Sequence, residues 1–325
     1  MIDFNNLFKS FESKKVLIIG DIMIDSYMWG ISNRMSPEAP VPIVEIEKYE
    51  KKLGGAGNVA LNIKSLGGEP ILCSVIGKDY DGKLIKEFLE EKNISSKGIL
   101  IEKERKTTVK TRIIANNKHQ IRIDEEETSS IKIEEDLIKL IKNIIQGVDV
   151  VILEDYNKGV LTENVIKKAI EYANKNNIPT IVDPKINNFK HYKDCTIFKP
   201  NLKEIINGMN IDVDENSEEN LKKVTEITRK ELNAKGLLLT LSSKGICINT
   251  EKYFQHTPAF KRDIIDVSGA GDTVVSVAAM CLTSNIEYSI LAKLANLAGG
   301  IVCEDVGVVP INKRKLLSEA IKHIN

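Results

Sequence analysis

Short, nearly continuous apolar runs alternate with amphipathic segments along most of this chain. The apolar runs cover residues 16–20, 71–76, 148–153, 179–182 and 237–241. Runs of this kind are typical of parallel strands that are covered on both faces. Residues 136–145 and 163–173 carry apolar side chains at intervals of three and four, which predicts helices between the strands. The pattern predicts an α/β fold with a doubly wound, mostly parallel sheet flanked by helices, and it places ligands at the carboxyl ends of the strands.

Two segments break this alternation. Residues 40–47 and 107–125 alternate apolar and polar side chains, which favours strands with one solvated face. Asn116, Asn117 and Lys118 interrupt the second segment as a hairpin turn would. We expect a small antiparallel β-sheet that serves as a lid over the active cleft, as a dimer surface, or as both.

Charge and composition exclude several classes of protein. The 325 residues contain 46 Lys and Arg and 46 Asp and Glu, so the formal net charge is zero and general nucleic-acid binding is not expected. No apolar run approaches the roughly 20 residues of a membrane span, and residues 1–14 lack the apolar core of a signal peptide. The five cysteines are scattered without a CxxC pair, which favours buried free thiols. We predict a cytoplasmic protein with neither nucleic-acid nor membrane partners.

The segment 266–272, with the sequence DVSGAGD, is the strongest candidate for a reactive site. Gly269, Ala270 and Gly271 lead into a segment with helical spacing, so the first amides of that helix are free to bind a phosphate or an oxyanion. Asp272 falls in the first turn, where a carboxylate could accept the proton of an attacking hydroxyl. The alternative is that Asp272 only stabilises the helix N-terminus and that the glycines only form a turn.

A second glycine-rich segment, at residues 53–60, also precedes a helical pattern. Gly54 and Gly55 would let a ligand approach the backbone closely, and the Asn58 amide could bind sugar hydroxyls. Close helix packing explains the glycines equally well. The chain contains neither a Walker phosphate loop nor a dinucleotide-binding fingerprint.

Two further candidates carry carboxylates. Asn201 and Glu204 could arrange a hydrated magnesium ion and nucleotide phosphates, or they could simply form a capping box at a helix start. Asp25 follows the first predicted strand, where a carboxylate could bind a sugar diol at the edge of the sheet. Asp21 could instead hold a turn.

The order and spacing of these motifs resemble the ribokinase-like (PfkB) family of sugar kinases over essentially the whole chain. In that family a GGxxxN segment binds the sugar, an Asn-x-x-Glu motif supports magnesium and phosphate, and a DxxGAGD motif supplies the anion hole and the base. The resemblance implies a ribokinase-like fold, ATP and Mg²⁺ as cofactors, and a homodimer formed through the lid strands. It implies that Glu204 holds Mg²⁺ through water and that Asp266 lies at a monovalent-cation site, with K⁺ as the expected ion.

The resemblance and the site arguments together assign roles to three sets of residues. The predicted catalytic residues are Asp272, Gly269, Ala270 and Gly271. The predicted substrate-binding residues are Asp25, Gly54, Gly55, Asn58, Arg112 and Lys185. The predicted nucleotide-binding residues are Asn201, Leu202, Lys203, Glu204, Thr240, Ser242, Gly245 and Asn296.

One branch of the family matches more closely. Residues 32–42 read SNRMSPEAPVP, and they resemble the SRxSPEAPVP segment of the heptose 7-phosphate kinases. The agreement continues at residues 20–25, 110–112, 120–124, 155–159 and 182–185. The branch implies ATP-dependent phosphorylation of the anomeric hydroxyl of D-glycero-D-manno-heptose 7-phosphate, giving the 1,7-bisphosphate for ADP-heptose biosynthesis.

A sugar phosphate needs cations, and the cleft and lid segments offer several. The candidates are Arg34, Lys110, Arg112, Arg122 and Lys185. For any one of them, a role as an ordinary surface charge is equally open.

The chain departs from bifunctional members of this branch, which add a nucleotidylyltransferase domain with an HxGH motif. That motif is absent, so we expect one kinase domain over residues 1–325, with lid strands near 40–47 and 107–125. Two other functions stay open: a PfkB-type kinase of another sugar or sugar phosphate, and a non-catalytic sugar-nucleotide sensor. The intact Asp272 and the segment 269–271 argue against the sensor.

Overall fold

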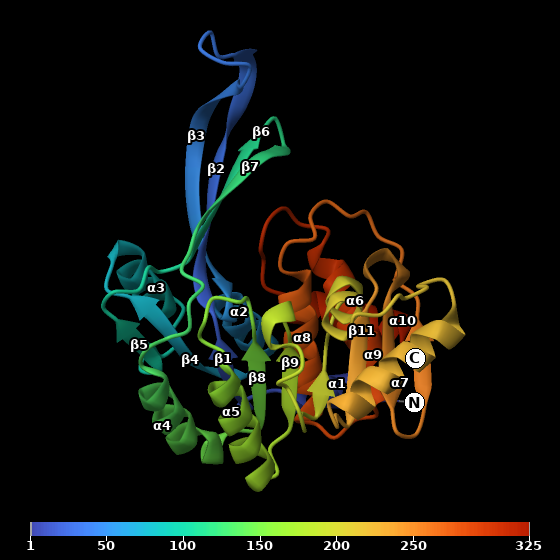
Figure 1. Cartoon of the computed structure of the whole chain (residues 1–325). Coiled ribbons are helices and arrows are strands. Elements are labelled where there is room, and N and C mark those ends of the chain that lie inside the picture. The colour runs from blue at the N-terminus through green and yellow to red at the C-terminus, as the bar shows by residue number, and fades with distance from the viewer. Residues whose placement is uncertain (1, 325) are drawn as a thin grey trace.

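The main sheet forms the centre of the molecule in the computed structural model, which describes residues 2–324 (Figure 1). Its strands are β1 (Lys15–Gly20), β4 (Glu69–Gly77), β5 (Ile99–Glu102), β8 (Val150–Glu154), β9 (Thr180–Asp183), β10 (Ile197–Phe198), β11 (Gly236–Thr240), β12 (Ile246–Thr250) and β13 (Phe254–Thr257). Within the described residues these nine strands follow the order β13-β12-β11-β10-β9-β8-β1-β4-β5. The strands from β11 to β5 are parallel, and β12 and β13 add antiparallel pairs at one edge.

Helices cover both faces of this sheet because its strand residues point alternately to either side. The helices are α1 (Phe4–Ser10), α2 (Ala56–Leu66), α3 (Tyr80–Glu91), α4 (Glu134–Ile144), α5 (Glu163–Lys175), α6 (Leu202–Met209), α7 (Glu218–Glu231), α8 (Ala270–Leu282), α9 (Tyr288–Val302) and α10 (Lys313–His323). Val16 and Ile18 belong to the apolar cluster that contains α1, α2, α3, α8, α9 and α10. Leu17 and Ile19 belong to the cluster that contains α4, α5, α6 and α7. The predicted doubly wound sheet is confirmed.

A second, smaller sheet projects from the body, and we call it the lid sheet (Figure 1). It consists of β2 (Ile22–Met35), β3 (Pro42–Gly55), β6 (Val109–Ala115) and β7 (Lys118–Glu125), in the order β3-β2-β6-β7. The pairs β2–β3 and β6–β7 are antiparallel, whereas β2 and β6 are parallel. Asn116 and Asn117 have φ angles of 52° and 59°, as a tight hairpin turn with two left-handed residues requires.

The strand β2 is the element of the lid sheet that the alternation pattern does not reveal. Its first six residues are buried and its outer half is largely exposed, so no single period runs through it. Because β2 follows β1 after one residue, the lid sheet begins at the carboxyl end of the main sheet.

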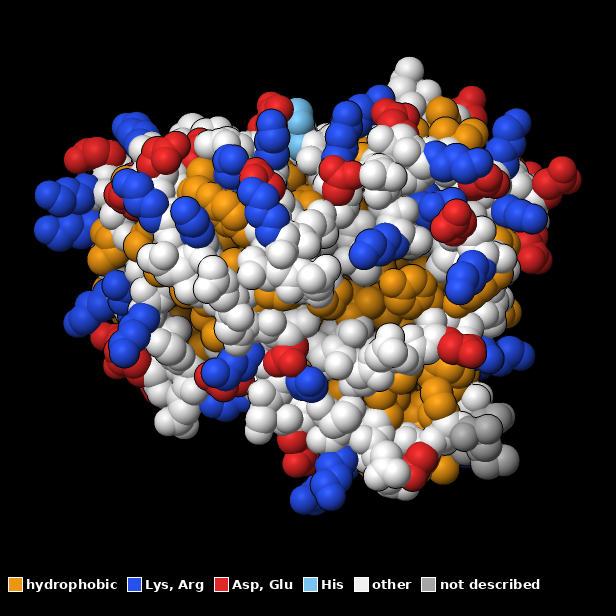
Figure 2. Space-filling view, turned by 90° about the horizontal axis from the view of Figure 1, so that it is seen from below, with side chains coloured by type: hydrophobic (Ala, Val, Ile, Leu, Met, Phe, Trp, Pro, Cys, Tyr) orange, Lys and Arg blue, Asp and Glu red, His pale blue; other side chains and the backbone are white. Residues whose placement is uncertain are grey.

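The surface agrees with the balanced charge of the sequence. Figure 2 shows Lys and Arg side chains interspersed with Asp and Glu over the face seen from below. All five cysteines are buried and free, as predicted. Within residues 2–324, no helix combines the length and the apolar character that crossing a bilayer demands.

Candidate active site

Asp272 lies where the N-terminus of α8 meets the carboxyl ends of β8 and β9. Gly269 has a φ of +78°, so α8 begins at Ala270 and places Asp272 in its first turn. The Asp272 carboxylate is 4% exposed and accepts hydrogen bonds of 2.7 Å from the Tyr156 hydroxyl and from the Asn58 side-chain amide. These partners belong to other elements, so the carboxylate faces the site and does not cap its own helix.

The surroundings of Asp272 make it a weaker acid than usual. Burial raises its pKa to about 6, the hydrogen bonds from Asn58 and Tyr156 lower it in part, and the charges of Asp183 and Asp25 add to the rise. A carboxylate with a pKa in this range is ionised at neutral pH and is a stronger proton acceptor than an exposed one.

The predicted substrate-binding residues on the lid side lie together at the base of the lid sheet. Asp25 on β2 forms an ion pair with Arg112 on β6, and the Arg112 guanidinium lies 5.5 Å from the centre of the Tyr27 ring. A Cβ atom at Gly54 would overlap the Asp25 carboxylate, and Gly55 has a φ of +55°. The two glycines are therefore explained by this close packing and by the positive φ of Gly55 at the start of α2.

The motif at the start of α6 forms the capping box that its sequence predicts. The Glu204 amide donates to the Asn201 side chain at 2.9 Å, and the Glu204 carboxylate accepts from the Asn201 amide at 2.8 Å. Leu202 and Lys203 form the first turn between them. The other carboxylate oxygen of Glu204 lies 3.0 Å from the Lys185 Nζ atom. Lys185, which was predicted to bind substrate, therefore pairs with Glu204 at the N-terminus of α6.

Four residues predicted for nucleotide binding come from separate elements. They are Thr240, Ser242, Gly245 and Asn296. Thr240 ends β11 beside Asn201, and a short 3₁₀ turn, Ser242–Lys244, leads to Gly245. Gly245 has a φ of +94° and packs against the chain at residues 257–259. The Asn296 side chain, on α9, donates to the Pro258 carbonyl at 2.8 Å. Thr240 therefore lies beside the N-terminus of α6, whereas Gly245 and Asn296 both contact residues 257–259.

Asp266 ties the loop before α8 to neighbouring backbone. Its carboxylate accepts hydrogen bonds of 2.9 Å from the amides of Ser268 and Gly307. Burial opposes ionisation, but these amides, aided by His119, hold the pKa of Asp266 below its usual range. His119, next to the turn between β6 and β7, lies 3.8 Å from this carboxylate.

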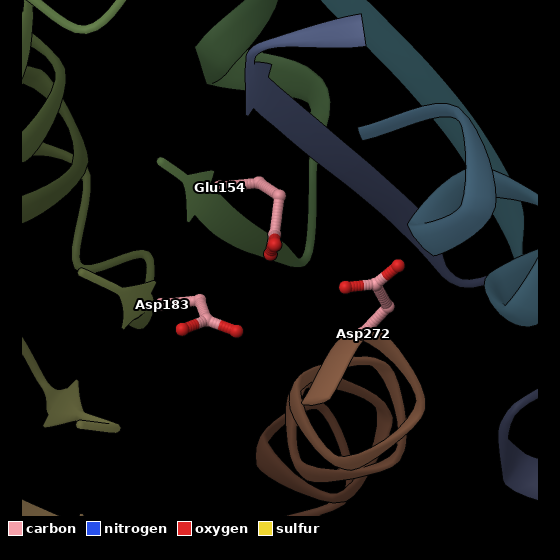
Figure 3. A group of neighbouring side chains, drawn as sticks. All are labelled: Glu154, Asp183 and Asp272. Atoms are coloured by element: carbon pink, nitrogen blue, oxygen red, sulfur yellow. The ribbon is translucent and has the colours of Figure 1, made fainter. Parts of the chain in front are cut away.

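The structure adds acidic residues that the sequence arguments did not single out. Glu154 ends β8 and Asp183 ends β9, and one oxygen from each lies within 4.8 Å of one from Asp272. Figure 3 shows the three carboxylates pointing into one space. Lys199 lies 2.8 Å from Asp183. A carboxylate at the end of a buried strand is the signal that pointed to Asp25, and the same signal could have identified Glu154 and Asp183.

Comparisons with known proteins give a consistent result. A family profile described as pfkB family carbohydrate kinase matches residues 13–314. The protein named "Bifunctional protein HldE" of Campylobacter jejuni is 41% identical over 306 residues, which are 94% of this chain and 64% of that protein. The chain thus spans less than two thirds of the length of this relative.

Solved structures share the fold at low sequence identity. Phosphofructokinase-2 from Escherichia coli in complex with potassium matches 94% of this chain and 99% of its own, with a TM-score of 0.77 and 17% identity. Arabidopsis thaliana ribokinase complexed with ribose and ATP has the same coverage and identity and a TM-score of 0.72. These matches confirm the expected ribokinase-like fold.

The pair of Lys199 and Asp183 provides a test of this arrangement. Lys199 is 2% exposed and Asp183 is 5% exposed, so Lys199→Met would leave a buried carboxylate without its nearest cation. We expect the free energy of unfolding in urea to fall by about 3 kcal/mol, the lower end for a broken buried pair, because Lys185 lies 3.7 Å from Asp183 and compensates in part. Adding Asp183→Asn to Lys199→Met should restore part of the loss. No recovery in the double variant would contradict the pairing.

Proposed function

Because the chain belongs to the pfkB family of carbohydrate kinases, we propose that it transfers the γ-phosphoryl group of ATP to the anomeric hydroxyl of D-glycero-D-manno-heptose 7-phosphate. The product would be the 1,7-bisphosphate, an intermediate of ADP-heptose biosynthesis. The observation that carries the proposal is the buried Asp272 carboxylate in the first turn of a helix that begins at Gly269. The heptose-kinase segment at residues 32–42 and the identity to the relative named "Bifunctional protein HldE" support the choice of sugar.

In this reaction Asp272 accepts the proton of the sugar hydroxyl. Asn58 and Tyr156 hold its carboxylate in place through their hydrogen bonds. The backbone amides of residues 269–271 stabilise the transferring phosphoryl group, because they are free donors at a helix N-terminus. Burial of the site removes water that would compete as acceptor.

The buried Glu204 carboxylate, at the carboxyl ends of the main-sheet strands, fits a magnesium ion, which prefers oxygen ligands and keeps several waters. Glu204 would hold Mg²⁺ through water, and the ion would neutralise charge on the phosphate oxygens. Lys185, 3.0 Å from Glu204, supplies a further positive charge on this side. Asp266 is the proposed position for K⁺, and the shared fold with a potassium-bound phosphofructokinase-2 supports it.

The remaining predicted residues bind the two substrates in this proposal. Asp25, Gly54, Gly55 and Arg112 form the sugar side at the base of the lid sheet. The nucleotide side consists of residues 201–204 at the N-terminus of α6, together with Thr240, Ser242, Gly245 and Asn296. The lid sheet covers the sugar between them.

Two alternatives rest on the same fold. A related kinase could act on another sugar or sugar phosphate, because the shared motifs do not define the acceptor. A non-catalytic sugar-nucleotide sensor would not need a base beside an anion-binding helix. We also propose a cytoplasmic location, which the five free cysteines support.

The first experiment is a substrate panel. The purified protein is mixed with Mg-ATP and with free and phosphorylated sugars, including the heptose 7-phosphate, and ADP release is followed together with product NMR. We expect preferential formation of the heptose 1,7-bisphosphate. Turnover with another sugar would support kinase activity but contradict the proposed substrate. No turnover with any sugar would favour the non-catalytic sensor.

Asp272→Asn tests the proposed base. We expect kcat to fall by about 10²–10⁴-fold, the usual contribution of a general base, while nucleotide affinity is largely kept. In the unchanged protein kcat should fall as the pH drops through the pKa of Asp272, since only its ionised form accepts a proton. Asp212→Asn, at an exposed carboxylate, is the matched control and should leave kcat unchanged. Near-normal turnover by Asp272→Asn would reject this assignment.

We propose further that two copies associate through the lid sheet. Tyr49, Ile121 and Ile123 on its strands are 70%, 57% and 46% exposed, which is unusual for large apolar side chains in a free sheet. Light scattering should give a dimer for the unchanged protein and a monomer for Ile121→Glu combined with Ile123→Glu. The control is Ile227→Glu on α7, at a residue that is 44% exposed, which should stay dimeric. A monomeric unchanged protein would contradict the proposal.

A further inference from the structure

The Glu154 side chain lacks the compensation that a buried carboxylate needs. Glu154 is 0% exposed, and neither of its carboxylate oxygens has a hydrogen-bond partner among residues 2–324. An ionised carboxylate in such a place is strongly unfavourable unless a cation or several donors compensate it. The structure therefore leaves a specific ligand of Glu154 to be identified.

The carboxylate of Glu154 points toward two other acidic side chains (Figure 3). One oxygen each from Glu154, Asp183 and Asp272 lies within 4.8 Å of the other two, and all three residues are buried. Two oxygens that share one ion are at most about 4 Å apart for Mg²⁺ and about 5 Å apart for Ca²⁺, twice the metal–oxygen distance. The three carboxylates are therefore close enough to converge on one ion, with water at its other positions.

The charges around this cluster do not balance without a cation. Lys199 lies 2.8 Å and Lys185 lies 3.7 Å from Asp183, and Lys185 also lies 3.0 Å from Glu204. These two ammonium groups balance the carboxylates of Asp183 and Glu204. The carboxylates of Glu154 and Asp272 remain, and together they carry the charge that one divalent ion would neutralise.

We propose that Glu154, Asp183 and Asp272 form a binding site for a hard divalent cation, Mg²⁺ or Mn²⁺, which is occupied in the absence of nucleotide. This site differs from the nucleotide-linked position assigned above to Glu204, because its ligands come from the protein alone. It depends on the geometry of the three carboxylates and not on which sugar the protein phosphorylates. A cation here keeps Glu154 ionised inside the protein.

The test uses Mn²⁺ as the probe and protein that has been freed of metal with EDTA. Calorimetric titration without nucleotide should show one saturable Mn²⁺ site, and Mg²⁺ should compete for it. Glu154→Gln should weaken the affinity at least about tenfold, since even the loss of an outer partner of a metal ligand costs 10–100-fold. Asp212→Asn, at an exposed carboxylate away from the cluster, is the matched control and should keep nucleotide-free Mn²⁺ binding.

Thermal unfolding gives a second readout that does not depend on catalysis. At the same Mn²⁺ concentration, the Tm of the unchanged protein should rise more than that of Glu154→Gln. In EDTA the Glu154→Gln variant should unfold at a higher temperature than the unchanged protein, because a neutral amide costs less to bury than an unpaired carboxylate.

Two results would overturn the proposal. One is the absence of saturable Mn²⁺ binding to the unchanged protein, which would indicate that Glu154 holds a proton. The other is equal Mn²⁺ affinity in the unchanged protein and in Glu154→Gln. A wrong sugar assignment would appear in product analysis and would leave these titrations unaffected.

Discussion

The Asp272 carboxylate is bound by two side chains from opposite parts of the fold, and the site depends on this arrangement. Asn58 reaches it from α2, and Tyr156 reaches it from the loop after β8. That loop is itself held by Asp21, whose carboxylate accepts hydrogen bonds from the amides of Tyr156, Lys158 and Val160 at 2.8, 3.1 and 3.1 Å. Asp21 thus holds a turn, and through Tyr156 it helps to fix the orientation of the proposed base.

The same edge of the sheet concentrates charge in a buried space. Glu154, Asp183 and Asp272 are all less than 6% exposed, and Lys199 lies against Asp183. Charged groups in such a setting interact more strongly than in water, and each needs a partner to offset its desolvation. This is the environment that phosphoryl transfer requires, because donors and cations are already in place where charge develops. A bound cation at Glu154 would complete that balance before nucleotide arrives.

The sequence predicted those structural features that are determined by residues close together in the chain. The capping box of Asn201 and Glu204, the hairpin turn at Asn116 and Asn117, and the buried parallel strands are of this kind. The strand β2 escaped prediction because its inner half is buried and its outer half is largely exposed. Glu154 escaped prediction because its importance arises from Asp183 and Asp272, which lie far from it in sequence and meet it only in the fold.

The substrate-binding residues show the same limit. Arg112 was predicted to bind substrate, with a surface role left open, and its binding to Asp25 follows from the pairing of β2 with β6. Lys185 was predicted in the same way, and its position beside Glu204 depends on α6. Sequence thus indicated which residues carry charge near the cleft, while the partner of each charge depends on tertiary contacts.

A structure of the protein with a non-hydrolysable ATP analogue, Mg²⁺ and the heptose 7-phosphate tests the central claim most directly. We predict that the anomeric hydroxyl lies about 2.6–3.2 Å from an Asp272 carboxylate oxygen, within hydrogen-bond reach of the base, with the γ-phosphate at the amides of residues 269–271. A sugar bound with its anomeric hydroxyl away from Asp272, or a γ-phosphate away from the N-terminus of α8, would contradict the account.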